Sequence, residues 1–256
     1  MGCDGAHSLV RYQLGVAFEG EAFEQRFAVA DVRVAWPLPG DEVFAFLNRG
    51  NFMAFFPMAG GLHRVAIAYP AAAEPDGSVS VAELQESLDR NGPTGARITD
   101  VAWTSRFRIN QRKASRQSAG RLFLTGDAAH VHSLVGAQGM NTGIQDAINL
   151  AWKPAMHIQR VAPRALLDTY ETERGSVARR LVHGTRRFTR LTLLRAPVAT
   201  AARRRIAPLV LSRPAVQQRI ALAISQTDVS YRESPLRAGP AAKHAPAPGD
   251  RAPERT

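Results

Sequence analysis

The stretch GRLFLTGDAAHVHSLVGAQGMNTGIQDAINL, residues 120–150, decides the fold. It predicts an apolar strand over residues 121–126, followed by Asp127 and by a run of small residues that leads into a helix beginning near Asn141. Short, uniformly apolar strands are typical of buried parallel sheets, and open α/β sheets hold their ligands at the carboxyl ends of their strands. Asp127 is therefore predicted at a ligand-binding edge, where a carboxylate can accept hydrogen bonds from sugar-like hydroxyls.

Three glycines after Asp127 indicate a close approach between backbone and ligand. Gly136, Gly139 and Gly143 carry no Cβ, and the helix near Asn141 presents unpaired N–H groups and the positive end of its dipole. Such a helix end suits a ring that becomes anionic, as reduced flavin does, although a phosphate or a carboxylate would satisfy the same donors. A plain strand–loop–helix connection with an Asp cap is the alternative that this spacing leaves open.

Six segments carry a resemblance to one family. Residues 120–153 resemble the GD motif of the class A flavin monooxygenases, the aromatic-ring hydroxylases of the para-hydroxybenzoate hydroxylase fold. GCDGAHSLVR, residues 2–11, resembles the DG motif of this family, Asp-Gly-x-x-Ser-x-x-Arg. NFMAFFPM resembles its substrate-covering sheet, and LLDTYETERGSVARRLV resembles its helical Tyr-x-x-Glu-Arg segment. DVSYRESPL and PGDRAP resemble the lead-in to the thioredoxin-like domain of the phenol and polyketide hydroxylase branch, so the resemblance spans nearly the whole chain.

The resemblance implies an FAD-dependent monooxygenase that consumes NAD(P)H and O₂ and hydroxylates a small aromatic or polyketide-like substrate. No catalytic acid or base is implied, because the cofactor carries the chemistry and the protein supplies orientation, charge and exclusion of water. In the family, Asp127 would accept hydrogen bonds from FAD hydroxyls, and the start of the following helix would offer backbone amides to the flavin. The implied cofactor-binding residues are Asp4, Arg11, Gly126, Asp127, Gly136, Gly139, Met140 and Asn141.

Two departures from the family pattern keep alternatives open. The Gly-x-Gly-x-x-Gly segment that binds the FAD pyrophosphate is not found in these 256 residues, and the thioredoxin-like domain would begin where the chain ends, so we expect a chain that lacks both. Leu134 stands where the family usually has a proline beside the flavin ring. An inactive, truncated FAD-binding fragment is one alternative function, and a flavoprotein oxidoreductase that does not insert oxygen is another.

The predicted fold class is α/β with α+β: a partial FAD-binding domain of the para-hydroxybenzoate hydroxylase fold, an antiparallel substrate sheet and C-terminal helices. The expected domains are 1–11 and 97–159 for parts of the FAD-binding domain, 12–96 for the substrate-binding β-sheet, 160–236 for a helical region, and 237–256 for a linker or disordered tail. Turn residues between apolar runs predict about four antiparallel strands over residues 27–70 and a further long strand over 96–114.

Several helices are expected. One is capped by Ser80 and stops at Gly92. A second carries an apolar stripe of Ile144, Ala147, Ile148, Ala151 and Trp152 until Pro154 ends or kinks it, and a third covers residues 165–174 before Gly175 and Ser176 break it. In the sheet, the candidates for a hydrophobic wall over the substrate are Phe46, Phe55, Phe56 and Met58, although aromatic side chains in a sheet more often belong to the core.

Composition narrows the remaining function classes. The formal net charge is +11, but only three of the 33 basic residues are lysines, a skew that favours coding bias over a nucleic-acid-binding surface. Neither a nucleic acid nor a membrane is an expected partner, whereas a homodimer stays open. A single cysteine, Cys3, excludes an internal disulfide and favours a cytoplasmic location. His130 and His132 lack a third ligand at useful spacing, so no metal site is expected.

Overall fold

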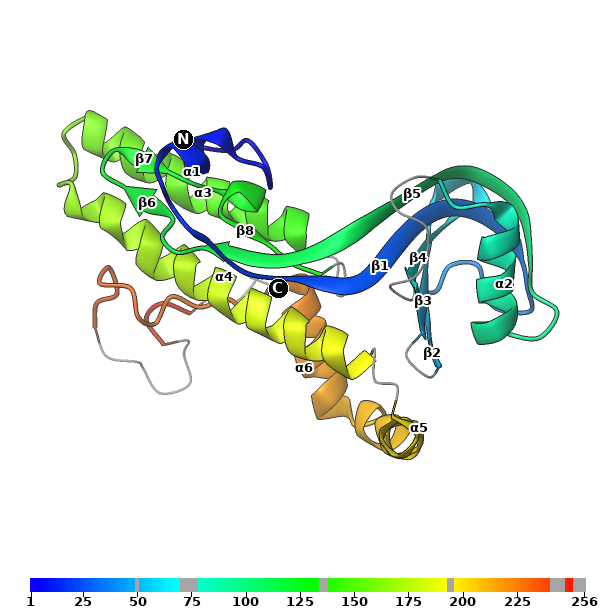
Figure 1. Ribbon diagram of the computed structural model, residues 1–256. Helices are drawn as coiled ribbons and strands as arrows, with labels where there is room; N and C mark the ends of the chain where they lie inside the picture. The colour runs from blue at the N-terminus through cyan, green and yellow to red at the C-terminus, as the bar shows by residue number, and fades with distance from the viewer. Residues whose placement is uncertain (49–50, 70–77, 134–137, 193–195, 240–246, 251–256) are drawn as a thin grey trace. The chain divides into compact units, whose positions relative to one another are not determined.

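The computed structural model describes residues 1–48, 51–69, 78–133, 138–192, 196–239 and 247–250 (Figure 1). The chain divides into two compact units. The first consists of Met1–Glu21, Asn110–Arg187 and Leu209–Thr256, and the second of Ala22–Ile109 and Phe188–Pro208. Helices and an antiparallel sheet occur together, which confirms the predicted mixture of α/β and α+β structure.

The second unit is built on an antiparallel sheet. Its strands are β2 (Phe44–Asn48), β3 (Asn51–Pro57), β4 (His63–Tyr69) and most of β1 (Phe18–Ala35) and β5 (Arg97–Ala114), whose outer ends belong to the first unit. They lie in the order β2-β3-β4-β1-β5, and the long strands β1 and β5 are neighbours (Figure 1). The four strands predicted over residues 27–70 and the long strand after them are confirmed, except that β1 begins earlier than predicted, at Phe18.

Alternating side chains divide this sheet into two faces. On one face, Met53, Phe55 and Ile67 pack against Leu84 and Leu88 of α2 (Val81–Asn91), all of them buried. Ser80 caps α2 in a capping box with Glu83, and Gly92 is its C-cap, so the predicted helix is confirmed. The opposite face carries a second buried cluster of small and aromatic side chains, which are Phe27, Phe52, Ala54, Ala66, Ala68 and Ile109.

The sheet corrects the expected hydrophobic wall in part. Phe55 is fully buried on the α2 face, where its ring lies 4.6 Å from that of Trp36, and Phe46 packs into the same cluster. Both belong to the core because the two-residue period of a strand turns them toward α2. Phe56 lies on the opposite face beside the second cluster, and Met58 is exposed after the end of β3.

The first unit carries the segment that decides the fold. Its elements are α1 (Leu9–Gln13), β6 (Ser118–Ala119), β7 (Leu122–Phe123), the short 3₁₀ helix η2 (Gly126–Ala128), β8 (His130–Val131), α3 (Gly139–Ile158), most of α4 (Ala165–Thr192) and α6 (Pro214–Ser225). The remaining elements are η1 (Ala59–Gly61) and α5 (Pro197–Leu211). β8 pairs antiparallel with the end of β5, where Lys113 faces His130.

The predicted buried parallel strand over residues 121–126 is wrong. Only Leu122–Phe123 forms a strand, and it pairs antiparallel with β6. Gly2 provides a single parallel bridge to Leu124, with Gly2 N donating to the Phe123 carbonyl at 2.7 Å and Thr125 N donating to the Gly2 carbonyl at 3.0 Å. Among the described residues, Gly2 is therefore the only parallel partner of this segment, and the segment does not join a parallel sheet.

Pro154 does not end α3, and the predicted break of α4 at Gly175 and Ser176 is wrong. α3 continues through Pro154 to Ile158, and α4 continues through Gly175 and Ser176 to Thr192. A glycine inside a helix costs only about 1 kcal/mol relative to alanine. Burial on both sides outweighs such a cost, because Arg174 before the Gly–Ser pair and Ala178 after it are completely buried.

α3 is inverted relative to an ordinary amphipathic helix. The predicted apolar stripe exists, but Ile144, Ile148 and Trp152 are 50%, 64% and 42% exposed. The opposite, buried face carries Asp146 and Lys153, both completely buried. Buried charges require partners, so the packing of α3 rests on a polar network that also reaches the predicted site. Among the described residues, no helix is both long and apolar enough to span a membrane.

Candidate cofactor site

The turn that carries Asp127 lies against α3. Gly126 has a φ of 58°, in the left-handed region, and an ideal Cβ at Gly143 would lie 3.3 Å from the Gly126 Cα. Gly143 therefore serves close packing between the helix and the turn, whereas its spacing had indicated an approach to a ligand. Asp127 is exposed, and its carboxylate accepts no hydrogen bond from any described residue. This carboxylate is free to accept hydrogen bonds from a ligand.

The start of α3 offers backbone donors beside this turn. Gln138 is the N-cap, and its side chain makes no capping hydrogen bond to the helix. Gly139 is half-buried, and Met140 and Asn141 are exposed. The first N–H groups of an α-helix have no partner within the helix, and no other described residue accepts a hydrogen bond from these three amides. Gly136, the remaining predicted residue of this segment, lies outside the described residues, as does Leu134.

The two predicted residues of the DG motif make contacts within the protein. Asp4 accepts hydrogen bonds from Ser8 Oγ at 2.5 Å and from Val10 N at 3.1 Å, and it thereby supports the start of α1. The hydrogen bond from Ser8 is the main cause that lowers the pKa of Asp4. The exposed carboxylate of Asp4 therefore stays ionised, with part of its hydrogen-bonding capacity used by α1.

Arg11 joins the DG motif to the turn of the GD motif. Its side chain donates to the carbonyls of Ala128 at 2.8 Å and Ala6 at 2.7 Å, and its guanidinium lies 3.7 Å from the centre of the Phe18 ring. Arg11 is 9% exposed, so the bond to Ala128 is shielded from water. The two motifs, more than a hundred residues apart in sequence, are thus brought together at this turn.

The histidine pair takes two different roles. His130 is completely buried, and its Nε2 lies 2.7 Å from Asp146 Oδ2. His132 Nδ1 lies 2.9 Å from the Ser133 carbonyl, while its Nε2 has no partner among the described residues and faces the start of α3, 3.5 Å from an ideal Cβ at Gly139. Burial lowers the pKa of His132, so the ring is neutral near pH 7. In the described part of the chain, no three His, Cys, Asp or Glu residues gather as a metal site would require.

Asp146 is the centre of a buried network that sequence reasoning missed. Its Oδ2 accepts hydrogen bonds from His130 and, at 3.3 Å, from the backbone N–H of Gly126. Its Oδ1 lies 2.6 Å from Arg174 Nε, and both charged side chains are completely buried. The available signal was the placement of Asp146, Asn149 and Lys153 on the helix face opposite the apolar stripe.

Arg174 extends this network along α3 and into the segment after α6. Its guanidinium donates to the Thr142 carbonyl at 3.2 Å, to Gln145 Oε1 at 3.3 Å and to the Tyr231 hydroxyl at 2.9 Å. Burial acts to lower the pKa of Arg174, but the charge of Asp146 and the contact with Tyr231 outweigh it, and the pKa is raised. Arg174 is therefore permanently charged and holds the first two turns of α3.

A second buried ion pair joins the same two helices. Lys153 Nζ lies 2.6 Å from Glu173 Oε2, which also accepts from Asn149 Nδ2 at 2.7 Å. Ser234 Oγ donates to the other carboxylate oxygen, at 2.6 Å. Burial acts to raise the pKa of Glu173, but these donors lower it overall, so the carboxylate is ionised. None of these contacts reaches the Asp127 turn.

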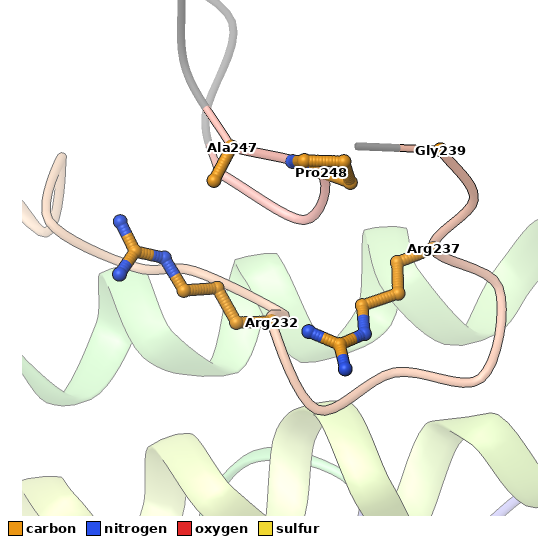
Figure 2. Close-up of a pocket in the computed structure, with 5 residues that line it drawn as sticks. All are labelled: Arg232, Arg237, Gly239, Ala247 and Pro248. Atoms are coloured by element: carbon orange, nitrogen blue, oxygen red, sulfur yellow. The ribbon is translucent and has the colours of Figure 1, made fainter. Parts of the chain in front are cut away.

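A cavity of about 360 Å³ opens at a different place in this unit (Figure 2). It is lined by Arg232, Arg237, Gly239, Ala247 and Pro248, all from the chain that follows α6. Arg232 is paired with Asp250 through two contacts of 2.6 and 2.8 Å. No predicted site residue lines this cavity, so it is separate from the Asp127 turn.

Comparison with known proteins identifies relatives of nearly the whole chain. The family described as "FAD binding domain" matches residues 1–185. An aromatic compound monooxygenase of Bacillus subtilis is 36% identical over 233 residues, which cover 90% of this chain and 46% of the relative. The 6-methylpretetramide 4-monooxygenase of Streptomyces rimosus is 38% identical over 250 residues, which cover 93% of this chain and 44% of that enzyme.

Solved structures give the same result. An anhydrotetracycline hydroxylase from Streptomyces rimosus matches with a TM-score of 0.71 and 31% identity, over 98% of this chain and 49% of the hydroxylase. An aromatic hydroxylase from angucycline biosynthesis matches with a TM-score of 0.75 and 30% identity, over 98% of this chain and 50% of the hydroxylase. The chain thus spans about half the length of the relatives that it matches.

Proposed function

Because the chain belongs to the FAD-binding domain family of flavin-dependent aromatic monooxygenases, we propose that it holds the flavin of such an enzyme at the Asp127 turn and the start of α3. The observation that supports this proposal is the pairing of a free carboxylate with free helix N–H groups across a close helix–turn contact. A carboxylate suits the hydroxyls of an FAD ribityl or ribose group, and amides with a positive helix end suit the electron-rich edge of the ring.

Each group has a defined part in this proposal. Asp127 accepts hydrogen bonds from the hydroxyls, while Gly139, Met140 and Asn141 donate from the backbone toward the ring. His132, neutral at pH 7 and aimed at the start of α3, offers its free Nε2 as an acceptor. Asp4 and Arg11 form the side of the proposed site next to the Asp127 turn, where Arg11 donates to the Ala128 carbonyl. When bound, FAD supplies the redox chemistry, which is reduction by NAD(P)H and activation of O₂.

The substrate class follows from the family and from the sheet. Relatives are named as monooxygenases of anhydrotetracycline, rifampicin and pentachlorophenol. We infer an electron-rich aromatic or polyketide-like substrate for this chain and assign its binding to the sheet of residues 12–96. We assign the ring to the face opposite α2, where the aromatic side chains Phe27 and Phe52 lie among the small side chains of Ala54, Ala66 and Ala68.

The remaining assignments belong to the same proposal. Residues 1–11 and 97–159 contribute to the FAD-binding domain, and residues 160–236 form a helical region that supports it. The linker or disordered tail expected over residues 237–256 lies mostly outside the described residues. We infer a cytoplasmic enzyme, since one exposed cysteine, Cys3, suits a reducing compartment. A homodimer is the assembly to test, by light scattering of the purified chain.

A titration with FAD tests the proposed site. The purified chain is titrated while flavin fluorescence and thermal stability are followed, because a ligand that binds only the native state raises the melting temperature. Asp127→Asn removes a charge-assisted acceptor and is expected to weaken binding about tenfold or more. Asp41→Asn, which changes an exposed aspartate of the other unit, is the matched control. Equal affinities of the two variants would contradict the assigned role of Asp127.

Two further outcomes separate the alternative functions. A wild-type chain that binds no FAD would show that this half does not hold flavin alone, in agreement with an inactive fragment. A chain that binds FAD and oxidises NAD(P)H in the presence of phenols, yet releases only hydrogen peroxide, would favour an oxidoreductase that does not insert oxygen. A product heavier than the phenol by one oxygen atom, detected by mass spectrometry, is the expected result.

A further inference from the structure

The buried carboxylate of Asp146 connects the two segments to which the proposed function assigns flavin. We propose that Asp146, held by Arg174, is a positioning residue for the cofactor: it sets the Gly126–Ala128 turn against the start of α3 without contacting the flavin. The inference rests on the proposed function of these two segments. It adds that the affinity for FAD depends on an ion pair in the interior of the protein.

The contacts of Asp146 lie on both sides of the candidate site. Oδ2 accepts from Gly126 N, the residue immediately before Asp127, and from His130, which follows the turn. One carboxylate oxygen therefore holds the turn at its beginning and at its end. The Ala129 N–H closes the turn between them by donating to the Gly126 carbonyl at 2.8 Å.

Arg174 connects the same carboxylate to the first turns of α3. While Nε binds Asp146 Oδ1 at 2.6 Å, another nitrogen of the guanidinium donates to the Thr142 carbonyl at 3.2 Å. Thr142 in turn donates its backbone N–H to the Gln138 carbonyl at 3.0 Å and its hydroxyl to the same oxygen at 2.8 Å. The peptide between Gln138 and Gly139 is planar and trans, so holding its carbonyl also orients the N–H of Gly139.

A charged network at this position is not explained by stability. Replacing a buried ion pair by well-packed apolar side chains is often neutral or stabilising, because the charges must lose their hydration. An apolar side chain at position 146 could fill the space, but it could not accept from Gly126 N or from His130. The network is therefore suited to holding backbone geometry, and Gly143 allows the helix to approach the turn closely enough for these bonds to form.

The second ion pair provides an internal control. Lys153 and Glu173 join the same two helices, α3 and α4, and are nearly as deeply buried as Asp146 and Arg174, with Glu173 5% exposed. Their other partners are Asn149, Thr169 and Ser234, and none of their contacts involves the turn or the first turn of α3. Breaking this pair damages the interface between the helices and leaves the candidate flavin contacts in place.

The test compares Asp146→Asn with Glu173→Gln in the full chain. Each change removes one buried negative charge and keeps the shape of the side chain, so both variants are expected to melt at a lower temperature than the wild type. Only Asp146→Asn is expected to weaken FAD binding, by about tenfold or more, while Glu173→Gln stays within about twofold of the wild type. Equal losses of affinity at equal losses of stability would overturn the positioning role.

A second measurement does not depend on flavin. Hydrogen exchange of the apoprotein, followed by mass spectrometry, reports the protection of the amides of residues 126–131 and 138–143. We expect faster exchange in both segments for Asp146→Asn and not for Glu173→Gln, relative to the rest of α3. Unchanged protection of both segments would overturn the proposal. If the two variants differ in exchange as expected but the wild-type chain binds no FAD, the proposed function is refuted, while the structural coupling through Asp146 is established.

A milder variant covers the case in which Asp146→Asn does not fold. Arg174→Lys keeps the positive charge but loses the planar fork that reaches both Asp146 and the Thr142 carbonyl. The expected result is an intermediate loss of FAD affinity, with increased exchange confined to residues 138–143. Wild-type affinity and wild-type exchange in a folded Arg174→Lys protein would contradict the assigned role of the guanidinium.

Discussion

Gly143→Ala perturbs the contact on which the candidate site depends. The new Cβ would lie 3.3 Å from the Cα of Gly126, so the turn would have to move by a few tenths of an ångström. It has little freedom to do so, because the Ala128 carbonyl is held by Arg11 and Gly126 N by Asp146. Overpacking of this kind costs about 1–3 kcal/mol. The change from glycine to alanine inside a helix, by contrast, stabilises the folded protein by about 1 kcal/mol.

The expected net effect of Gly143→Ala therefore lies between no change and a loss of about 2 kcal/mol, as the difference of those two terms. Gly184→Ala is the matched control, because Gly184 lies inside α4 with nothing within 4 Å of its ideal Cβ. It gains the same helix propensity without a clash, and it is expected to stabilise the protein by about 0.5–1 kcal/mol.

Urea unfolding measures both variants under the same conditions, with the free energy of unfolding taken from the midpoint at an unchanged slope. A titration with FAD, where the wild type binds it, shows whether the shifted turn also weakens the site. The reasoning would be refuted if Gly143→Ala stabilised the protein as much as Gly184→Ala does, since the helix and the turn would then not be in close contact.

Three further predictions concern buried polar groups. Tyr170→Phe leaves the Leu124 carbonyl without the donor that lies 2.8 Å away, and is expected to cost about 1–3 kcal/mol in urea unfolding, with no loss expected from ring packing. Burial lowers the pKa of His63 below 6.5, so the unfolded chain binds more protons just below that pH. Stability should therefore fall as the pH decreases from 6.5, and more shallowly in His63→Phe. Arg11→Lys cannot hold Ala128 and Ala6 together and should cost about 1–2 kcal/mol in the same assay, whereas Arg64→Lys, at an exposed pair, should cost less than about 1 kcal/mol.

Local patterns in the sequence were sufficient for several elements. The alternation of apolar residues over positions 27–70 determined the antiparallel strands, because a half-buried strand has a period of two. Ser80 and Gly92 marked the ends of α2, because capping residues act on the nearest backbone groups. The GD and DG segments identified the family, which the comparison with known proteins confirmed.

Other features depended on partners that are distant in sequence. Pro154 was expected to end or kink a helix and Gly175 to break one, but neither helix ends there, because the burial of Lys153 and Arg174 beside them outweighs a local preference of about 1–3 kcal/mol. Likewise, the apolar stripe of α3 indicated the helix but not its buried face, which is the polar one. A periodicity reveals that a helix has two faces, whereas the neighbours of the helix decide which face is buried.

The candidate site likewise combines features that are local in sequence with features that depend on distant partners. Asp127 and the start of α3 could be chosen from the sequence, because a carboxylate after a strand and amides at a helix start are local features. Asp146 and Arg174 could not be paired in this way, since 28 residues separate them and only the packing of α3 on α4 brings their charges to 2.6 Å. Sequence alone was therefore sufficient to select the chemical groups that we propose contact a cofactor. The tertiary structure determined the buried charges that hold those groups in position, because a buried charge is stable only where folding supplies its partner.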